Sequence, residues 1–501
     1  MTTNFSANTL GTSSESNTQN SAHTILKVSF FILGAMLVLF FSASMVSGFK
    51  EIWTSLKEKS IAIVTKTVGT EMKKDENGNV NVLLLWYGGN GHDGGFLTDS
   101  IIIASRNPEV GTVSMFSIPR DLRVKYTTGG YGRINASFYL LLKQNNDDRE
   151  LATSWARAEF WKMLGLDIPY YATIDFTAFK GLVDAVGGID IVVPETIHDT
   201  TYPNDANRWY ITFHIDAWEQ HLDGATALKY ARSRHSTSDF SRSLRQQIIL
   251  KGIKEKLVNS GFSTSTALEL YDVYAQYIKT NIASQELLWA SQFIKNIGEF
   301  SSFGFTTNCS FQNFLRMVPA CFLYYPSREL FWGASVMLPM DATPKDIQHY
   351  EDMQKFTQFI TSHPQMIKEK TSISVVSAID SQLAKDHRMG NTKFNDQLAV
   401  KLKRYWFNVI DSMIRADPME YSTVSVNNIG DYTATIEALK TFIPDLRVEY
   451  NTWNIQSWRD ENGNPITFVE GADITVILGN DYLLGSPTMS GLVETKFSFK
   501  L

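Results

Sequence analysis

Cysteine is scarce in this sequence of 501 residues, and positive charge is not in excess. Only two cysteines are present, Cys309 and Cys321, and they lack the spacing typical of a zinc site. They are compatible with one disulfide, which would contribute about 3 kcal/mol in the chain-entropy model, or with two buried free thiols. Because 52 Asp and Glu outnumber 46 Lys and Arg, for a net charge of −6, a nucleic-acid partner is not expected.

Motifs of several common enzyme classes are missing as well. No Gly-x-Ser-x-Gly stretch indicates a serine hydrolase, and no pair of carboxylates indicates a glycosidase. The glycine-rich loop at residues 87–95 has no Gly-Lys-Ser/Thr, which excludes a phosphate-binding P-loop. The histidines His92, His214, His221 and His235 do not have the spacing of metal ligands.

Only one long hydrophobic run is present, at residues 28–49, and it contains no charge. As a helix it is long enough to cross a hydrocarbon core of roughly 30 Å. We interpret it as an uncleaved transmembrane anchor that follows a disordered tail at residues 1–27. The alternative is a cleaved signal peptide, because small residues stand at 42–44. Lysines flank the run on both sides, and their number weakly favours a cytoplasmic location for the residues after it.

The rest of the chain alternates between predicted strands and helices. We predict a stalk at residues 50–79, a main domain at 80–342, a helical linker at 343–371 and a smaller α/β domain at 372–501. In the main domain this alternation indicates an α/β fold, an αβα sandwich with a mixed central sheet. Strands are expected there at residues 80–86, 100–105, 113–118, 171–175 and 189–193, and helices at 152–164 and 176–186.

The last third of the chain also has clear local signals. Thr343 followed by Pro344 is a typical helix start, and this helix is expected to end at Ser362, before His363 and Pro364. The second α/β unit is expected to contain strands at 373–376, 423–426, 446–450 and 474–478, with helices at 398–413 and 432–442.

Residues 230–247, Y-A-R-S-R-H-S-T-S-D-F-S-R-S-L-R-Q-Q, contain four arginines. Asp223 is expected to open a helix that ends near Tyr230, and Ser238 or Asp239 can cap a second helix. The arginine-rich stretch would therefore lie at the turn between two helices.

The spacing of these arginines places their side chains on common faces. Arg242, Arg245 and Gln246 stand at i, i+3 and i+4 of the second helix. Arg232 and Arg234 would point the same way in an extended segment. Guanidinium groups that converge beside a helix N-terminus can bind a polyanion such as a pyrophosphate. The alternative is a solvated surface with a few ion pairs.

Four ordered motifs, which span residues 80–257, resemble those of one known family. They are N-V-L-L-L with T-D-S-I after it, S-I-P-R-D, R-I-N-A-S-F, and Y-A-R-S-R-H with D-F-S-R and R-Q-Q. The set is similar to that of the LytR-CpsA-Psr family, membrane-anchored phosphotransferases of bacterial cell envelopes. The resemblance implies a single-pass protein of the cell membrane, with a cytoplasmic N-terminus and extracytoplasmic domains. The segment G-A-D-I-T-V-I-L-G-N-D-Y resembles the end of the LytR-type C-terminal domain.

The resemblance also implies roles for individual residues. It implies pyrophosphate contacts for Arg120, Arg133, Arg232, Arg234, Arg242 and Gln246. Arg120 and Arg242 would be catalytic, together with Asp239, which would orient an arginine or act as a base. Arg133 occupies a position where the family more often has lysine, which keeps the charge.

A magnesium ion, Mg2+, is a further implication of the resemblance. Asp99 in T-D-S-I matches one family ligand, and carboxylate oxygen suits this metal. The second family carboxylate would follow the first strand, where this chain has Gly88. Asp93 in the glycine-rich loop is the nearest replacement, and its alternative role is that of an ordinary turn residue.

The resemblance implies an enzyme that moves a glycopolymer or its linkage unit from a polyprenyl pyrophosphate carrier to peptidoglycan, with pyrophosphate hydrolysis as a second reaction. Apolar helices at 138–142 and 160–164 could take the polyprenyl tail, although such helices are usually plain core. The first alternative is a non-catalytic envelope protein that binds a polyprenyl phosphate, which would fit the missing carboxylate at Gly88. A DNA-binding attenuator is disfavoured by the acidic pI of about 5.9 and the membrane segment.

Overall fold

The computed structural model describes residues 69–89, 95–204, 209–233, 321–387, 393–414, 417–450 and 472–485, with residue 389 and short stretches between 245 and 305. The predicted tail, membrane anchor and most of the stalk lie outside these residues. The same holds for five site candidates and one cysteine: Asp93, Arg234, Asp239, Arg242, Gln246 and Cys309. Within the described part of the chain, no helix has the length and apolarity needed to span a bilayer.

The main domain is built on a six-stranded sheet with the order β11-β6-β1-β2-β3-β12. The strands are β1 (Val80–Tyr87), β2 (Thr98–Arg106), β3 (Val113–Ile118), β6 (Tyr170–Asp175), β11 (Lys279–Thr280) and β12 (Phe300–Gly304). Strand β1 pairs antiparallel with β2 and parallel with β6, so the sheet is mixed. Every residue of β1 is buried, which explains why the strand is apolar except for Asn81. The predicted α/β fold with a mixed central sheet is confirmed.

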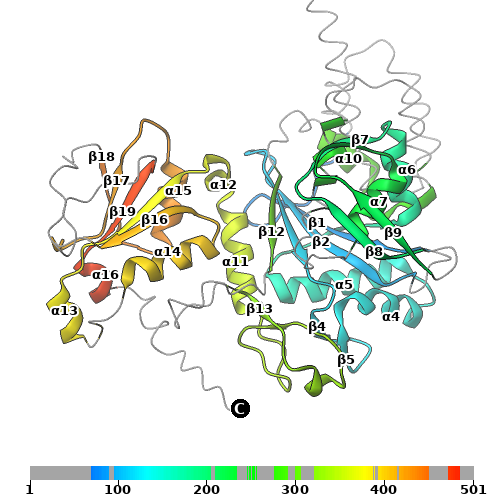
Figure 1. Ribbon diagram of the computed structural model, residues 1–501, viewed down its shortest axis with the longest axis horizontal. Coiled ribbons are helices and arrows are strands. Elements are labelled where there is room, and N and C mark those ends of the chain that lie inside the picture. Colours follow the sequence, from blue (N-terminus) through cyan, green and yellow to red (C-terminus); the bar gives the residue numbers. More distant parts are fainter. Residues whose placement is uncertain are drawn as a thin grey trace, which may run out of the picture.

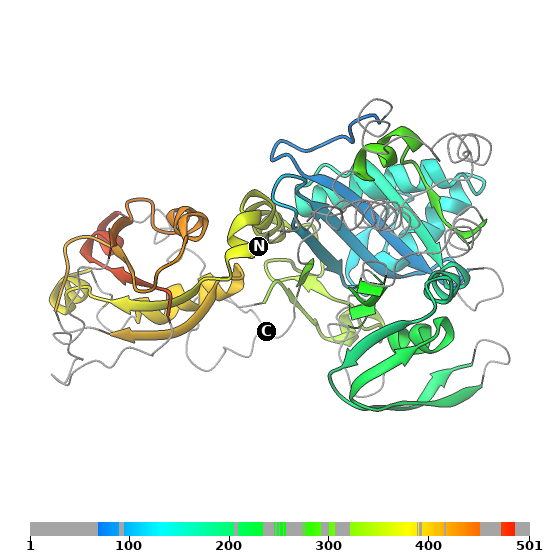
Figure 2. The same ribbon diagram turned by 90° about the horizontal axis from the view of Figure 1, so that it is seen from above.

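Helices cover both faces of this sheet (Figures 1 and 2). Alternation along β1 points Leu83 and Leu85 toward α4 (Ser137–Gln144) and α5 (Arg149–Leu164). The residues between them, such as Leu84, point toward α6 (Phe176–Ala185) and α7 (Gly224–Arg232) on the other face. Each face therefore has its own hydrophobic core.

Short strand pairs project from the main domain. They are β4 (Arg123–Lys125) with β5 (Tyr131–Arg133), β7 (Ile189–Val193) with β10 (Trp218–Leu222), β8 (Ile197–Pro203) with β9 (Tyr210–Ile215), and β13 (Leu323–Tyr324) with β14 (Leu338–Pro339). Two 3-10 helices, η2 (Ile134–Ala136) and η4 (Arg328–Phe331), follow β5 and β13, and α10 (Ser284–Ser291) follows β11.

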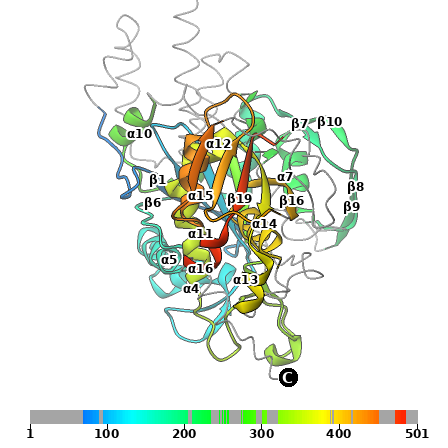
Figure 3. The ribbon, with the colours of Figure 1, turned by 90° about the vertical axis from the view of Figure 1, so that its left-hand side faces the viewer.

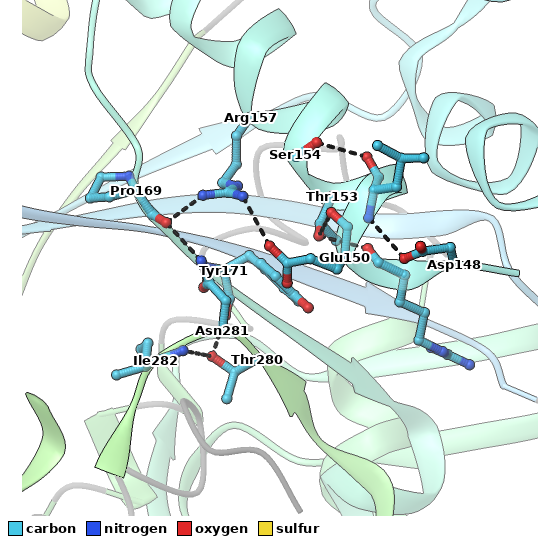
Figure 4. A network of polar contacts seen from close by, with 12 residues as sticks. Asp148, Glu150, Thr153, Ser154, Arg157, Pro169, Tyr171, Thr280, Asn281 and Ile282 are labelled. Carbon is cyan, nitrogen blue, oxygen red and sulfur yellow. Dashed lines mark hydrogen bonds and ion pairs between the residues drawn. The ribbon is translucent and has the colours of Figure 1, made fainter. Parts of the chain in front are cut away.

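Polar contacts tie helix α5 to the edge of the sheet at β6 and β11 (Figure 4). The Pro169 carbonyl oxygen accepts hydrogen bonds from Arg157 and, at 2.9 Å, from the Asn281 side chain. Asn281 in turn accepts from the Tyr171 backbone N–H at 2.9 Å. The short strand β11 is therefore held by side chains as well as by its ladder.

A second, smaller domain contains a five-stranded mixed sheet with the order β16-β15-β19-β17-β18 (Figure 3). Its strands are β15 (Ser372–Ser377), β16 (Asn408–Ile414), β17 (Thr423–Val426), β18 (Arg447–Tyr450) and β19 (Ile474–Leu478). Its helices are α12 (Pro364–Glu369), α13 (Ser381–Asp386), α14 (Phe394–Arg404), α15 (Thr433–Lys440) and α16 (Asn480–Gly485). A second α/β unit was predicted, and it is present.

Two of the predicted helix boundaries are wrong. The helix expected from Thr343 begins only at Glu351, as α11 (Glu351–Ser362), because residues 343–346 close a turn in which Thr343 and Asp346 bond to each other's backbone. The helix expected at 398–413 ends at Arg404. Trp406 then adopts a left-handed φ of 71°, and β16 follows. Pro364 opens the separate helix α12 rather than only ending α11.

The predicted linker is a packed part of the core, because α11 lies between the two domains (Figure 1). On α11, the Phe356 ring lies 5.9 Å from Phe303 of the main domain and 6.0 Å from Tyr405 of the second domain, centroid to centroid. An ion pair of 2.7 Å between Arg404 and Asp352 adds a polar contact at this junction. A single hydrophobic cluster consequently runs through both domains.

Candidate functional site

Two arginines and two carboxylates meet at one edge of the main sheet. Asp99 is the second residue of β2, and Arg120 follows the end of β3, the neighbouring antiparallel strand. Arg120 Nη1 lies 2.9 Å from Asp99 Oδ1, and Arg120 Nε lies 3.7 Å from Asp121 Oδ2. Asp99 and Arg120, each proposed as a site residue from its own motif, lie side by side in the structure.

Arg133 joins the same cluster from the β4–β5 hairpin. Its Nε lies 3.2 Å from Asp121 Oδ1 and donates a hydrogen bond of 3.1 Å to the Ser335 carbonyl oxygen. Asp121 thus stands between two guanidinium groups, Arg120 and Arg133. The Arg120 side chain is 16% exposed and that of Arg133 39%, so both can reach a ligand from a partly desolvated position.

Arg232 is held separately, at the C-terminal end of α7. The expectation of an extended segment at Arg232 is wrong, because the helix that Asp223 caps continues through this residue. Its guanidinium carbon lies 4.5 Å from the Phe176 ring centroid, and its Nη1 donates to the Tyr202 hydroxyl at 3.1 Å. Aromatic stacking therefore fixes the orientation of this cation.

Arg245 has a structural role that its spacing did not indicate. Its side chain is only 5% exposed, and it donates hydrogen bonds to the carbonyl oxygens of Tyr230, at 3.0 Å, and Ser233. Burial lowers the pKa of this guanidinium. Arg245 therefore closes the end of α7 from inside the protein. Arg242 and Gln246 lie outside the described residues.

Asp175 is a carboxylate that the sequence reasoning missed. It ends β6 and lies directly beside Tyr87 in the parallel pairing with β1. Its Oδ1 caps α6 by accepting from the Ala178 N–H at 2.7 Å. A Cβ on Gly89 would lie 3.3 Å from Asp175 Oδ2, so this glycine, with φ of 89°, leaves room for the carboxylate. The signal was available as an aspartate at the end of a predicted strand.

Asp99 and Asp175 consequently flank the end of β1 on neighbouring strands. Among the described residues, no group of three or more acidic, histidine or cysteine side chains could hold a metal ion. A metal at this edge would therefore take single carboxylates from separate strands.

A small apolar pocket lies between the β4–β5 hairpin and the helices α4 and α5. These helices contain the apolar segments that were considered for a polyprenyl tail. The pocket is lined by Val124, Tyr126, Ile134, Leu140, Leu141, Ala156, Phe160 and neighbouring polar residues. Ile134 follows Arg133 directly, so the pocket and the charged cluster share one hairpin.

Gly132 of this hairpin has little space around it. A Cβ there would lie 2.0 Å from the Tyr126 hydroxyl oxygen, which donates to the Arg133 carbonyl oxygen at 2.8 Å. We expect Gly132→Ala to push Tyr126 aside and to lower the free energy of unfolding by about 1–3 kcal/mol, as overpacking does. A double-mutant cycle in urea checks this, because Tyr126→Ala should abolish most of the cost of Gly132→Ala. Additive costs would contradict the proposed clash.

The sequence left open whether Cys309 and Cys321 form a disulfide or are two free thiols. Cys321 is fully buried, and its sulfur takes part in a disulfide. The only other cysteine of the chain, Cys309, lies outside the described residues.

Comparison with known proteins gives consistent matches. Residues 46–308, just over half of the chain, match the model of the LytR_cpsA_psr family. The polyisoprenyl-teichoic acid–peptidoglycan teichoic acid transferase TagV of Bacillus subtilis is 31% identical over 200 residues, which cover 39% of this chain and 47% of TagV. TagU of Bacillus cereus, which has the same enzyme name, is 28% identical over 278 residues, which cover 52% of this chain and 81% of TagU. The chain thus spans about half the length of TagV.

Solved structures are similar over the same part. The crystal structure of B. subtilis TagV has 24% identity and a TM-score of 0.40, over 57% of this chain and 97% of that one. TagT bound to LIIa-WTA has 20% identity and a TM-score of 0.40, over 57% of this chain and 92% of that one. The family match ends before the second sheet, so the LytR-type assignment of that domain stays a prediction. With its ordered motifs and the match of residues 46–308, the chain belongs to the LytR-CpsA-Psr family.

Proposed function

We propose that this protein transfers a glycopolymer or its linkage unit from a polyprenyl pyrophosphate carrier to peptidoglycan. The observation that carries the proposal is the pair Arg120 and Arg133, both oriented by Asp121, beside an apolar pocket in a member of this family. The teichoic acid transferase names of TagV and TagU support the same substrate class. The anchor at residues 28–49, with both domains outside the cell, is part of the proposal.

The two guanidinium groups would hold the pyrophosphate. Arg120 is aimed by Asp99 and Asp121, and Arg133 by Asp121 and the Ser335 carbonyl, so neither has to be ordered when the ligand arrives. Two arginines against two aspartates leave the cluster neutral. A pyrophosphate therefore needs further positive charge, which Arg232 and the undescribed Arg234 and Arg242 would supply.

The transfer would be a displacement at phosphorus. A hydroxyl of the acceptor forms a new bond to the phosphorus that carries the glycan, and the bridging P–O bond of the pyrophosphate breaks. Polyprenyl phosphate leaves, and its new negative charge is stabilised by the arginines. The hydroxyl proton passes to a base, for which the family resemblance suggests Asp239. Attack by water instead of the acceptor would give pyrophosphate hydrolysis.

A magnesium ion held at this site would neutralise part of the negative charge of the pyrophosphate. Asp99 and Asp175 fit such an ion as single oxygen ligands, because magnesium usually keeps several waters and takes only one or two protein carboxylates. One oxygen of Asp99 faces Arg120, and one oxygen of Asp175 caps α6. Asp175 is therefore a second candidate, besides Asp93, for the metal ligand that the family has at the position of Gly88.

Three aspartate variants distinguish these ligands. Asp99→Asn is expected to raise the magnesium concentration needed for half-maximal transfer at least about tenfold, because it removes a charged oxygen ligand. Asp175→Asn keeps the helix cap, since asparagine caps as well as aspartate, and removes only the charge. The same titration with Asp93→Ala shows which residue is the second ligand.

A direct readout accompanies these titrations. The binding of Mn2+ to the full-length protein in detergent can be followed by electron paramagnetic resonance without any substrate. This binding should be weaker in the same variants. If Asp99→Asn changes neither the binding of Mn2+ nor the magnesium dependence, the proposed metal ligand is wrong.

The function itself is tested with a polyprenyl-pyrophosphate-linked disaccharide and purified peptidoglycan. Covalent transfer of the disaccharide to the peptidoglycan is the expected result. The missing carboxylate at Gly88 favours one alternative, a protein that binds polyprenyl phosphates without turnover. Retention of the lipid without product, at any magnesium concentration, would support that alternative instead.

A further inference from the structure

The β4–β5 hairpin places two guanidinium groups opposite each other. Arg123 and Arg133 are direct partners in the antiparallel ladder, so their side chains leave the same face of the hairpin. Like charges in such a position repel each other. Arg133 is compensated by Asp121, whereas the Arg123 side chain has no ion pair or hydrogen bond with any residue that the structure describes. The positive charge of Arg123 is therefore not compensated within the described part of the chain.

Aromatic rings surround this cation. The Arg123 guanidinium carbon lies 4.7 Å from the Phe331 ring centroid and 5.7 Å from that of Tyr131. Its Nε is buried and has no hydrogen-bond partner in the described part of the chain. A half-buried guanidinium with an unmet donor is suited to bind an anion from outside the protein.

Large exposed apolar side chains belong to the same hairpin or neighbour Phe331 in the chain. Tyr131 is 50% exposed, and Leu330 and Trp332, the chain neighbours of Phe331, are 57% and 91% exposed. Trp332 also adopts a left-handed backbone conformation, with φ of 52°, which is unfavourable for a bulky residue. A tryptophan side chain held almost fully in water is consistent with a binding role.

The position of this surface limits what it could bind. Val124 and Ile134 line the apolar pocket on one side of the hairpin, whereas Arg123 and Arg133 alternate with them and leave the other side. The described chain starts next to α10, where the Thr70 N–H bonds to the Gln285 carbonyl oxygen, at the end of the domain opposite the β4–β5 hairpin (Figure 1). The surface thus begins at the proposed pyrophosphate site and extends away from the apolar pocket. It also lies far from the start of the described chain near Thr70.

We propose that Arg123, Tyr131 and Trp332 form a binding subsite for the acceptor, a glycan strand of peptidoglycan. The flat rings of Tyr131 and Trp332 would stack on sugar rings, and Arg123 would pair with a carboxylate that the strand carries. This inference rests on the proposed function, because it takes the acceptor from there. Binding to Arg123 would bring the strand next to Arg133, where the glycan-bearing phosphorus would lie.

The test measures binding rather than transfer. Full-length protein in detergent is mixed with peptidoglycan sacculi stripped of attached polymer, and the dissociation constant is obtained by depletion. Trp332→Ala and Arg123→Met should each weaken binding by about tenfold, since central aromatic and arginine contacts dominate such sites. Methionine keeps an apolar stem between the two rings. Trp161→Ala on α5 replaces a tryptophan that is 56% exposed elsewhere, and it should bind as wild type.

A second variant separates binding from folding. Trp332→Gly relieves the left-handed strain, so its melting temperature should equal or exceed that of wild type while sacculus binding still falls.

Two additional ligands test whether the surface binds something other than peptidoglycan. A soluble poly(glycerol phosphate) represents the donor polymer, and phosphatidylglycerol vesicles represent a membrane surface.

The outcomes are distinguishable from failure of the proposed function. Loss of sacculus binding in both Trp332 variants and in Arg123→Met supports the subsite, whether or not the protein transfers glycan. Wild-type sacculus binding in these variants overturns it and leaves the proposed function intact. A defect confined to poly(glycerol phosphate) or to vesicles also overturns it, because the surface would then serve the donor or the membrane.

Discussion

Arg120→Lys is expected to lower the rate of transfer by at least about a hundredfold while the melting temperature changes little. Removing one group that stabilises developing charge in a transition state typically costs a factor of this size. Lysine keeps the positive charge but cannot reproduce the fork with which Arg120 faces Asp99 at 2.9 Å and Asp121 at 3.7 Å. The measurement is single-turnover transfer at saturating magnesium, with a thermal melt of the same preparation.

Arg157→Lys is a matched control for this experiment. The Arg157 side chain is 17% exposed, close to the 16% of Arg120, and it also pairs with a carboxylate, that of Glu150. It supports α5 against the Pro169 carbonyl, far along the chain from the charged cluster (Figure 4). We expect this variant to lower the melting temperature and to keep the transfer rate. Wild-type transfer by Arg120→Lys would show that Arg120 is only part of a solvated surface.

Phe356→Ala is expected to lower the free energy of unfolding by about 3–5 kcal/mol, the usual cost of deleting a fully packed aromatic ring. Phe356 is buried on α11, and its ring lies 4.8 Å from Phe322, 5.9 Å from Phe303 and 6.0 Å from Tyr405. Because these contacts include both domains, the variant should also separate one calorimetric transition into two. Differential scanning calorimetry of the full chain checks both effects.

Phe359→Ala provides the comparison on the same helix. Its ring lies 5.1–5.7 Å, centroid to centroid, from Tyr405, Phe407 and Phe442, which all belong to the second domain. We expect a similar loss of stability within one calorimetric transition, because the contacts of Phe356 with both domains stay intact. If Phe356→Ala also keeps a single transition, the Phe356 ring is not what couples the unfolding of the two domains.

The main sheet could be predicted from sequence because its strands carry strong local signals. β1 is apolar except for Asn81, and β3 was predicted with its observed bounds, since both strands are buried on two faces. Asp99 and Arg120 come together because β2 and β3 are neighbouring antiparallel strands. Asp175 was missed because its closeness to the end of β1 depends on parallel pairing between segments about 90 residues apart, which no local pattern shows.

Local signals failed where tertiary packing decided the structure. Asn408–Ile414 contains residues that suit either a helix or a strand, and it became β16 because it pairs in parallel with β15. Arg245 looked equivalent to its neighbours on a helix face, yet its side chain satisfies two backbone carbonyls inside the protein. Spacing defines which side chains share a face but not whether that face points to solvent.

The hydrophobic cluster shared through α11 has a consequence for how such a protein can change during evolution. A domain with its own closed core can be lost, gained or exchanged by recombination at a linker. Here a break at residue 342 would leave Phe303, Phe305 and Phe322 without Phe356, and so expose the rings that close the main domain. A main domain without the second one would have to keep α11. Polar residues would have to replace those side chains of α11 that now face Tyr405. The second domain is therefore inherited with the first unless several substitutions occur together.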